Sequence, residues 1–250
     1  MIDSSIVPQL MRNSADADAK KIAAGLSFFP SPQEIAEFAG LCVLKEELAG
    51  HKYLERLIEH GHSVAEVMVN LVAPAARWLG EQWDQDQIGF SEVTLGLLRM
   101  QNLTHELAAG DRFPKRYATD RFRVLVALAP GSQHILGLTM ISELFTSDGW
   151  DVRVETTGTE KALLSTLRSS WFDVVGLSVS LAEQLPDLNA LISKLRGNCR
   201  NPGVGVLLGG AALASAEAGS STYGSDAVCM DPLAATRIAR MLAMRGRGAS

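Results

Sequence analysis

The sequence lacks the features that mark several broad classes of protein. It has three cysteines in 250 residues, and no two of them have the spacing of metal ligands. A disulfide framework and a zinc site are therefore not expected, and a reducing cytoplasm fits. No run of about 18 apolar residues is present, so we expect no transmembrane helix. The N-terminus has early aspartates and no apolar segment after a basic start, so no signal peptide is expected.

Excess positive charge is also missing. The formal net charge is −5, with 23 Lys and Arg against 28 Asp and Glu, so the chain has no overall electrostatic attraction to nucleic acid. Basic residues cluster between positions 112 and 123, where aspartates dilute them, as is typical of a solvated linker. No helix-turn-helix or basic recognition element is present, so we expect no direct sequence-specific binding to DNA.

Helical periodicity fills the first half of the chain. Ser31, Pro32 and Glu34 predict a helix start, because serine caps free amide groups, proline fits the first turn and glutamate reaches back. Apolar residues then recur three and four apart in four segments with short joints, which predicts a four-helix bundle over residues 31–109, preceded by an arm over residues 1–30. The expected helices span residues 32–49, 52–60, 63–83 and 91–108, with stops at Gly50, Gly61 and Gly89 and a kink at Pro74.

The pattern changes after residues 110–121, which lack periodicity and are expected to link two domains. Five short apolar segments then alternate with five helix-like segments, which predicts a parallel sheet covered on both faces. The common strand order for such a sheet is 2-1-3-4-5. We therefore expect a Rossmann-like, flavodoxin-like domain over residues 122–245 and a short tail over residues 246–250. The expected strands span 123–128, 151–155, 174–179, 204–208 and 227–230, and the expected helices span 135–147, 160–169, 185–195, 211–218 and 233–245.

Three loops of this domain place polar or small residues at the end of a strand. Ser132 and His134 follow strand one, Ser178 and Ser180 follow strand three, and Gly209-Gly210 follows strand four. Strands one and three flank the topological switch point, where open parallel sheets bind ligands. Each feature alone is common, since loop histidines are usually solvated and serines or glycine pairs are ordinary turn chemistry. Their combination at one sheet edge predicts a ligand site.

The same loops resemble those of the cobalamin-binding domain of methionine synthase, cobalamin mutases and corrinoid shuttle proteins. That family carries Asp-x-His-x-x-Gly after strand one, Ser-x-Leu after strand three and Gly-Gly after strand four. The resemblance implies that His134 is the lower axial ligand of cobalt, that Ser178 contacts the nucleotide tail of the cofactor, and that the glycine pair makes room for it. The implied cofactor-binding residues of this domain are Ser132, Gln133, His134, Ile135, Gly137, Leu138, Ser178, Ser180, Gly209 and Gly210.

Two positions depart from the family pattern. Ser132 stands where the family has an aspartate, whose carboxylate would accept the second ring N–H of the histidine and raise its basicity as a ligand. Serine adds no charge, so we expect a weaker or differently tuned bond to cobalt. Ser180 stands where the family has a leucine.

The helical half carries a second resemblance. Residues 79–83 and 86–94 are similar to the helix pair that caps the upper face of cobalamin in carH-type light sensors, which implies that Trp83 lies over the corrin and that Val93 belongs to the same site. Those sensors have Glu-His where this chain has Val93-Thr94, so the usual upper-face histidine is absent. A tryptophan at helical spacing is also typical of a bundle core.

Residues 79–101 are most similar to the AerR/PpaA antirepressors of purple bacterial photosynthesis genes, which are related to the haem-binding domain of the AppA photoreceptor. This resemblance implies a cobalamin-bound, light- or redox-responsive regulator that acts through a transcription factor of the CrtJ/PpsR repressor type and is not an enzyme. The cofactor could be hydroxo-, methyl- or adenosylcobalamin. The alternatives are a corrinoid methyl carrier of a methyltransferase system, a haem sensor with His134 on iron, and a ligand-free scaffold.

Overall fold

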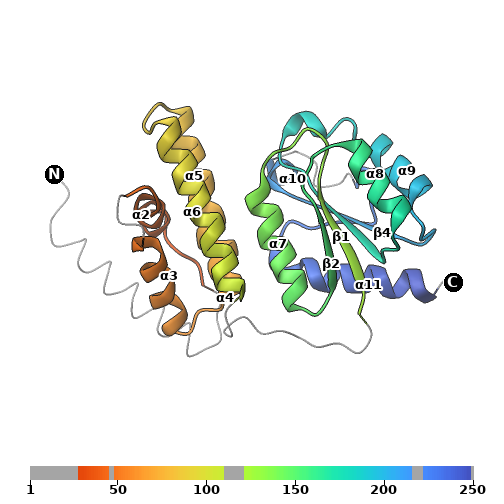
Figure 1. Ribbon diagram of the computed structural model, residues 1–250, viewed down its shortest axis with the longest axis horizontal. Helices are drawn as coiled ribbons and strands as arrows, with labels where there is room; N and C mark the ends of the chain where they lie inside the picture. Colours follow the sequence, from red (N-terminus) through yellow and green to blue (C-terminus); the bar gives the residue numbers. More distant parts are fainter. Residues whose placement is uncertain (1–27, 45–47, 110–120, 216–221, 249–250) are drawn as a thin grey trace. The chain divides into compact units, whose positions relative to one another are not determined.

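A computed structural model describes residues 28–44, 48–109, 121–215 and 222–248 of the chain (Figure 1). The molecule has two compact units, the first ending at Leu103 and the second beginning at Thr104. Residues 1–27 of the predicted arm (1–30) and residues 110–120 of the predicted linker (110–121) lie outside the described residues. In the described segments, no helix is both long and apolar enough to cross a bilayer.

The first unit is helical, as predicted. Ser31 caps its first helix: the Ser31 hydroxyl accepts a hydrogen bond from the amide of Glu34 at 3.3 Å, and the Glu34 carboxylate accepts one from the amide of Ser31 at 2.7 Å. Such reciprocal capping satisfies amide groups that the first helical turn leaves free. The unit contains α2 (Pro32–Val43), α3 (Ala49–Glu59), α4 (Val64–Val67), a π-helical turn (Met68–Val72), α5 (Ala73–Asp84) and most of α6 (Phe90–Ala109), whose last six residues belong to the second unit.

The prediction that Gly50 ends the first helix was wrong. α2 ends at Val43, and Gly50 lies in the first turn of α3. A Cβ atom on Gly50 would come within 3.2 Å of Cys42 Sγ and 3.3 Å of Leu103 Cδ1. Glycine is present there because three helices pack closely at this point, which periodicity along one helix does not show.

The helix that was expected to kink at Pro74 runs from α4 to α5 through the π-helical turn. Proline lacks an N–H group and clashes with the carbonyl group four residues earlier in a regular helix. Pro74 lies in the first turn of α5, directly after that wider turn. The insertion relieves the conflict without ending the helix.

α6 packs closely against the helices before it. A Cβ atom on Gly96 would lie 2.6 Å from Cδ1 of the fully buried Leu79, so α5 and α6 can approach at this point only because residue 96 has no side chain. Figure 1 shows the two helices side by side. Arg99 also donates hydrogen bonds to the carbonyl oxygens of Cys42, at 3.0 Å, and Leu44, and so joins α6 to the end of α2.

The second unit is a five-stranded sheet with order β2-β1-β3-β4-β5 and parallel pairing throughout. This confirms the predicted fold class and strand order. The strands are β1 (Arg123–Leu128), β2 (Asp151–Glu155), β3 (Val174–Ser178), β4 (Gly205–Gly209) and β5 (Ala227–Val228). The helices are α7 (Ile135–Ser147), α8 (Glu160–Ser169), α9 (Leu188–Asn198), α10 (Ala211–Ser215) and α11 (Ala235–Gly248).

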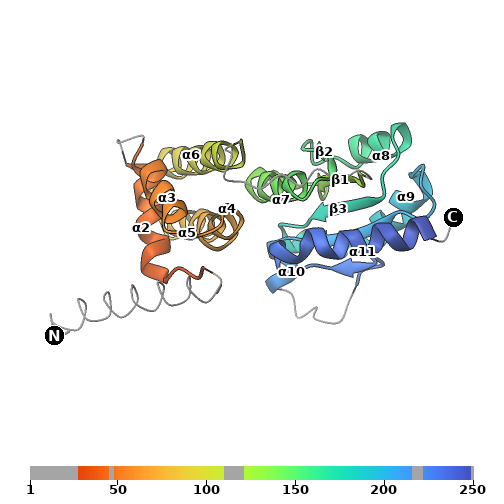
Figure 2. The same cartoon turned by 90° about the horizontal axis from the view of Figure 1, so that it is seen from below.

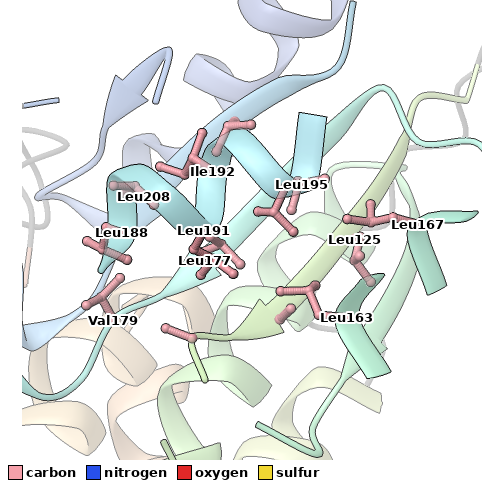
Figure 3. Packing of buried hydrophobic residues seen from close by; sticks show 14 of the residues in the cluster. Leu125, Leu163, Leu167, Leu177, Val179, Leu188, Leu191, Ile192, Leu195 and Leu208 are labelled. Carbon is pink, nitrogen blue, oxygen red and sulfur yellow. The ribbon is translucent and has the colours of Figure 1, made fainter. Parts of the chain in front are cut away.

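Helices cover both faces of the sheet (Figure 2). One core joins α8, α9 and α10 to the side chains of Leu125 and Leu177 (Figure 3). The other joins α7 and α11 to Val124 and Val126. Successive residues of a strand point to opposite faces, so a strand buried on both sides is apolar throughout. This is why short apolar runs predicted β1, β3 and β4 to within one residue at each end.

α11 continues to Gly248, beyond the predicted end of the domain at residue 245. Its last turn is held by Arg247, whose guanidinium group binds the carboxylate of Asp173 at 2.9 Å. The two residues are 74 positions apart, so the sequence pattern of the helix gives no sign of this contact.

Candidate functional site

His134 lies at the carboxyl edge of the sheet, between β1 and α7. It is the residue that precedes the first turn of α7, and it is exposed. Directly after β1, the amide of Ala129 donates to the carbonyl oxygen of Ser178 at 3.0 Å, and Leu128 pairs with Ser178. The loops that carry His134 and Ser180 therefore leave the sheet from adjacent strands, at the switch point where parallel sheets bind ligands.

Two glycines shape the loop that leads to His134. Gly131 has φ +88°, a conformation that glycine adopts without steric cost, and its amide donates to the carbonyl oxygen of Gly158 at 2.9 Å. Gly158 follows β2 with φ +60°, and a Cβ atom there would lie 2.4 Å from the carbonyl oxygen of Ser132. The loop after β2 thus supports the His134 loop. Sequence analysis missed Gly158, although its position just after a predicted strand was a signal.

Ser132 is directed toward the main chain of this loop. It is 2% exposed, and its hydroxyl accepts a hydrogen bond from the amide of His134 at 3.3 Å. In the described part of the chain, no hydrogen bond involves the His134 ring. Among the described residues, neither imidazole nitrogen therefore has a competing partner, which suits a residue that has to ligate a metal.

Gln184 connects the loops that follow β1 and β3. It is buried in a 3₁₀ turn (Ala182–Gln184), and its Oε1 accepts from the amides of Ser180 and Leu181, both at 3.0 Å. Its Nε2 donates to the carbonyl oxygens of Ala129 at 3.0 Å and Pro130 at 2.9 Å. Sequence analysis missed Gln184, because nothing in the local pattern distinguishes this glutamine from an exposed one.

The glycine pair after β4 meets the loop after β3. The amide of Val179 donates to the carbonyl oxygen of Gly209 at 2.8 Å. Gly210 has φ +117°, and a Cβ atom there would lie 2.3 Å from the carbonyl oxygen of Val179. A Cβ atom on Gly209 would meet Cys229 O at an ordinary 3.6 Å. Close packing within the domain therefore already requires glycine at position 210, whereas position 209 has more room.

The other predicted residues of the sheet domain differ in exposure. Gln133, Ile135 and Gly137 are exposed, and a Cβ atom on Gly137 would meet no atom within 4 Å. Leu138 is fully buried in the core between α7 and the sheet. Ser178 and Ser180 are half-buried. The first turn of α7 thus offers a glycine with open space above it, one turn from His134.

The helical unit holds the two predicted upper-face residues in different environments. Trp83 of α5 is 47% exposed, whereas Val93 of α6 is 6% exposed and belongs to the core of that unit. Phe90, Leu97 and Leu98 of α6 lie in the segment that carries the resemblance to the antirepressors, and all three are exposed. Their spacing of seven and eight residues places them on one face of the helix. Whether Trp83 and Val93 contact a cofactor stays a prediction.

The three cysteines are poor candidates for reactive groups. Burial raises the pKa of Cys42 to about 12, against a smaller opposite effect of Arg99. Burial also raises the pKa values of the Cys199 and Cys229 thiols. Because the thiolate is the reactive form, these thiols react slowly at neutral pH. In the described residues, no group of three or more His, Cys, Asp or Glu side chains gathers to hold a metal ion.

Residues 122–240, which include every predicted site residue of the sheet domain, match the family model described as the B12 binding domain. This part of the chain is a B12-binding domain. A single exposed histidine with a free ring fits such a domain, because corrinoid cobalt needs only axial ligands from outside its macrocycle. Three residues after this histidine, Gly137 has open space where a Cβ atom would lie.

Two further similarities concern more of the chain. It is 26% identical over 168 residues to an "uncharacterized 20.5 kDa protein in bchF-crtJ intergenic region" of Rhodobacter capsulatus, a match that covers 67% of this chain and 87% of that protein. Its structure is similar to that of the monomethylamine corrinoid protein of Methanosarcina barkeri, with a TM-score of 0.65 and 11% identity over 85% of this chain and 100% of that chain. The second similarity shows a shared fold, with helices followed by a five-stranded α/β domain.

Proposed function

We propose that the protein binds cobalamin through His134 and is a light- or redox-responsive regulator that controls transcription through a partner transcription factor. The observation that carries the cofactor assignment is the position of His134 at the switch point of a B12-binding domain, where its ring is exposed and has no hydrogen bond to any described residue. The regulatory role is supported by the similarity to a protein from the bchF-crtJ intergenic region. The partner that this similarity favours is a repressor of the CrtJ/PpsR type.

Different residues of the domain would bind different parts of the cofactor. The His134 imidazole would be the lower ligand of cobalt, and Ser178 and Ser180 would contact the nucleotide tail beside the sheet. Bound alkylcobalamin supplies a cobalt–carbon bond that light breaks. Ser132 would act on this site through the main chain, since its hydroxyl is bonded to the His134 amide. Because no carboxylate raises the basicity of the imidazole, we expect the bond between His134 and cobalt to be weaker and the ligand to exchange more readily.

A redox response would involve the cofactor more than the thiols. All three cysteines of the chain have thiol pKa values raised by burial, which keeps them protonated at neutral pH. A regulator that senses oxidation through cysteine needs an accessible thiolate. The cofactor site is therefore the better candidate for both stimuli.

A corrinoid methyl carrier is the second candidate, because the Methanosarcina barkeri protein with the same fold is itself a corrinoid protein. In that case the protein would serve a methyltransferase without catalysing the transfer. A haem sensor with His134 on iron is a third candidate. Haem has no nucleotide tail, so it would leave Ser178 and the glycine pair without a role in binding.

The visible spectrum of the purified protein tests these candidates. The protein is mixed with hydroxocobalamin, methylcobalamin, adenosylcobalamin or haem, in the dark and after illumination, and the same is done with His134→Ala. His60→Ala is the matched control, an exposed histidine of the helical unit whose Nδ1 lies 2.6 Å from the carbonyl oxygen of Arg56. We expect a cobalamin spectrum that changes in His134→Ala and not in His60→Ala.

Each candidate predicts a different result. An unchanged cobalamin spectrum in His134→Ala would overturn the axial-ligand assignment. Methyl transfer from an added donor with no response to light would favour the carrier, and binding of haem alone would favour the haem sensor. For the regulator, binding to a purified CrtJ/PpsR-type repressor should depend on cobalamin and on illumination.

A further inference from the structure

The four hydrogen bonds of Gln184 all go to main-chain groups of two loops at the carboxyl edge. Two go to the amides of Ser180 and Leu181, and two to the carbonyl oxygens of Ala129 and Pro130, which are 55 and 54 positions away in sequence. One side chain therefore hydrogen-bonds to four main-chain groups that lie just beyond the ends of β1 and β3. Buried main-chain groups without a partner would destabilise both loops.

These bonds continue to His134. The carbonyl oxygen of Ala129 accepts from Gln184 Nε2 at 3.0 Å and also from the amide of Ser132 at 3.1 Å. The Ser132 hydroxyl in turn accepts from the amide of His134 at 3.3 Å. Because Ser132 and Gln184 are both buried, water does not readily replace either link.

The chemistry at this position requires a side-chain amide. Its oxygen faces two N–H donors and its nitrogen faces two carbonyl acceptors, and a side-chain amide matches both, with two lone pairs on the oxygen and two hydrogens on the nitrogen. A carboxylate would keep the two bonds to Ser180 and Leu181 but would bring negative charge against the carbonyl oxygens of Ala129 and Pro130. A hydrocarbon of the same size would lose all four bonds.

We propose that Gln184 is a positioning residue, which fixes the loop that carries His134 against the loop that carries Ser180 and so sets where the imidazole meets cobalt. This inference rests on the proposed cobalamin function. It adds that the axial ligand and the residues proposed for the nucleotide tail are held in one register by a single buried amide. Loss of the Gln184 side-chain amide changes how much His134 contributes to cobalamin binding, although Gln184 itself does not contact the cofactor.

The first test needs no cofactor and uses amide hydrogen exchange in the full-length protein. Gln184→Met removes four bonds, Gln184→Glu removes the two on the His134 loop, and Glu183→Met is the control, an exposed neighbour in the same turn. In Gln184→Met, exchange should accelerate at Ser132 and His134 as well as at Ser180 and Leu181. In Gln184→Glu, the amides of Ser180 and Leu181 should stay protected while Ser132 and His134 exchange faster.

Unchanged amide hydrogen exchange at Ser132 and His134 in both Gln184 variants would overturn the inference. If Gln184→Met fails to fold, Gln184→Glu still decides it, because that variant keeps the bonds on the β3 side.

The second test is a double-mutant cycle with hydroxocobalamin. We expect Gln184→Met to weaken binding about tenfold, as loss of a residue behind a metal ligand typically does, and to shift the cobalt spectrum toward that of His134→Ala. The loss caused by His134→Ala should be smaller in the Gln184→Met background, because a misplaced ligand contributes less. Fold-changes that simply multiply, with an unchanged spectrum, would show that Gln184 acts on stability alone.

The two failures are distinguishable. If hydroxocobalamin does not bind the unaltered protein, or if its spectrum does not depend on His134, the proposed function fails whatever Gln184 does. If cobalamin binds through His134 but the Gln184 variants behave like Glu183→Met, only the positioning role fails.

Discussion

The two edges of the parallel sheet are built in opposite ways. At the carboxyl edge, the loops contain Gly131, Gly158 and Gly210 with positive φ, and the exposed ring of His134 has no hydrogen bond in the described structure. At the amino edge, the charged side chains of Asp173 and Arg247 pair with each other. One edge leaves polar groups available for a ligand, whereas the other satisfies them within the protein.

Asp173 is the centre of the amino edge. It is 2% exposed, and its carboxylate accepts from the amide of Arg123 at 2.7 Å and from the guanidinium group of Arg247. The Arg247 guanidinium carbon also lies 4.4 Å from the centroid of the Phe122 ring. The Asp173 carboxylate is thus paired and hydrogen-bonded, so it joins the starts of β1 and β3 to the last turn of α11 and is unavailable to a ligand. The comparison therefore predicts that function and stability can be changed separately.

The largest effect should come from His134→Ala. We expect affinity for hydroxocobalamin to fall by more than about a hundredfold, because loss of an outer partner of a metal ligand already costs about 10–100-fold. The free energy of unfolding of the cofactor-free protein should change by less than about 0.5 kcal/mol, since the side chain is exposed. Spectroscopic titration and chemical denaturation measure the two quantities. A large loss of stability in His134→Ala without a change in cobalamin affinity would contradict the proposal that the carboxyl edge binds the ligand and the amino edge stabilises the fold.

Asp173→Ala should have the opposite profile. Removing the carboxylate takes away the acceptor of the Arg123 amide and the ion pair of Arg247, and the free energy of unfolding should fall by about 2–3 kcal/mol. The Arg247 side chain is half exposed, so water compensates part of the loss. Urea denaturation measures the change, and the cobalamin spectrum of the folded variant should match that of the unaltered protein. Arg247→Ala should also destabilise the protein, because it leaves the buried Asp173 carboxylate with the Arg123 amide but without the guanidinium group that neutralises its charge.

A pair of glycine substitutions compares fold and site within the carboxyl edge. Gly210→Ala should lower the free energy of unfolding by about 2 kcal/mol, because of its φ of +117° and the 2.3 Å approach to Val179 O. Gly137→Ala should raise it by up to about 1 kcal/mol, since alanine favours a helix and nothing lies within 4 Å.

Cobalamin affinity should respond differently to these two changes. If Gly137 borders the cofactor, Gly137→Ala should weaken binding while it stabilises the fold. Unaltered affinity in Gly137→Ala would remove residue 137 from the predicted site. Thermal unfolding and cobalamin titration of both variants provide the comparison.

The smallest effect concerns Glu155, at the carboxyl end of β2. Its carboxylate accepts from the amide of Thr157 at 3.0 Å and from the hydroxyl of Thr166 at 3.3 Å. The bond from the Thr157 amide is the main cause that lowers the pKa of Glu155 below its ordinary value of 4.5. Stability from a carboxyl group with a lowered pKa is present above the unfolded-state pKa and is lost as pH falls through the folded-state pKa.

Glu155→Gln should therefore destabilise the protein by a few tenths of a kcal/mol at pH 7, a value kept small by solvent exposure. The difference from the unaltered protein should persist down to about pH 5 and vanish as the pH falls below the lowered pKa. Denaturation at pH 7, 5 and 3 measures it. A difference that grew with acidification would contradict the assigned hydrogen bonds.

The sequence was a good guide to the sheet domain and a weaker one to the site. A short apolar run gave β1 with its observed bounds, because a strand buried on both faces is apolar throughout. β2 also has its predicted bounds, but it is an exposed edge strand with charged residues. The end of the first helix was mispredicted, since Gly50 serves packing against Cys42 and Leu103. Ser132 was weighed as a partner of the His134 ring, but the structure shows it bonded to the His134 amide.

What the sequence by itself determined is the order of helices and strands, the parallel topology, and the placement of His134 where β1 gives way to α7. These follow from local periodicity and from the handedness of crossovers, which act over a few residues or along one element. Only the tertiary structure decided that Gln184 bonds to the His134 loop, that Gly158 lies against Ser132, and that Asp173 pairs with Arg247. Each of these joins segments between 26 and 74 residues apart, and such contacts depend on how whole strands pack side by side.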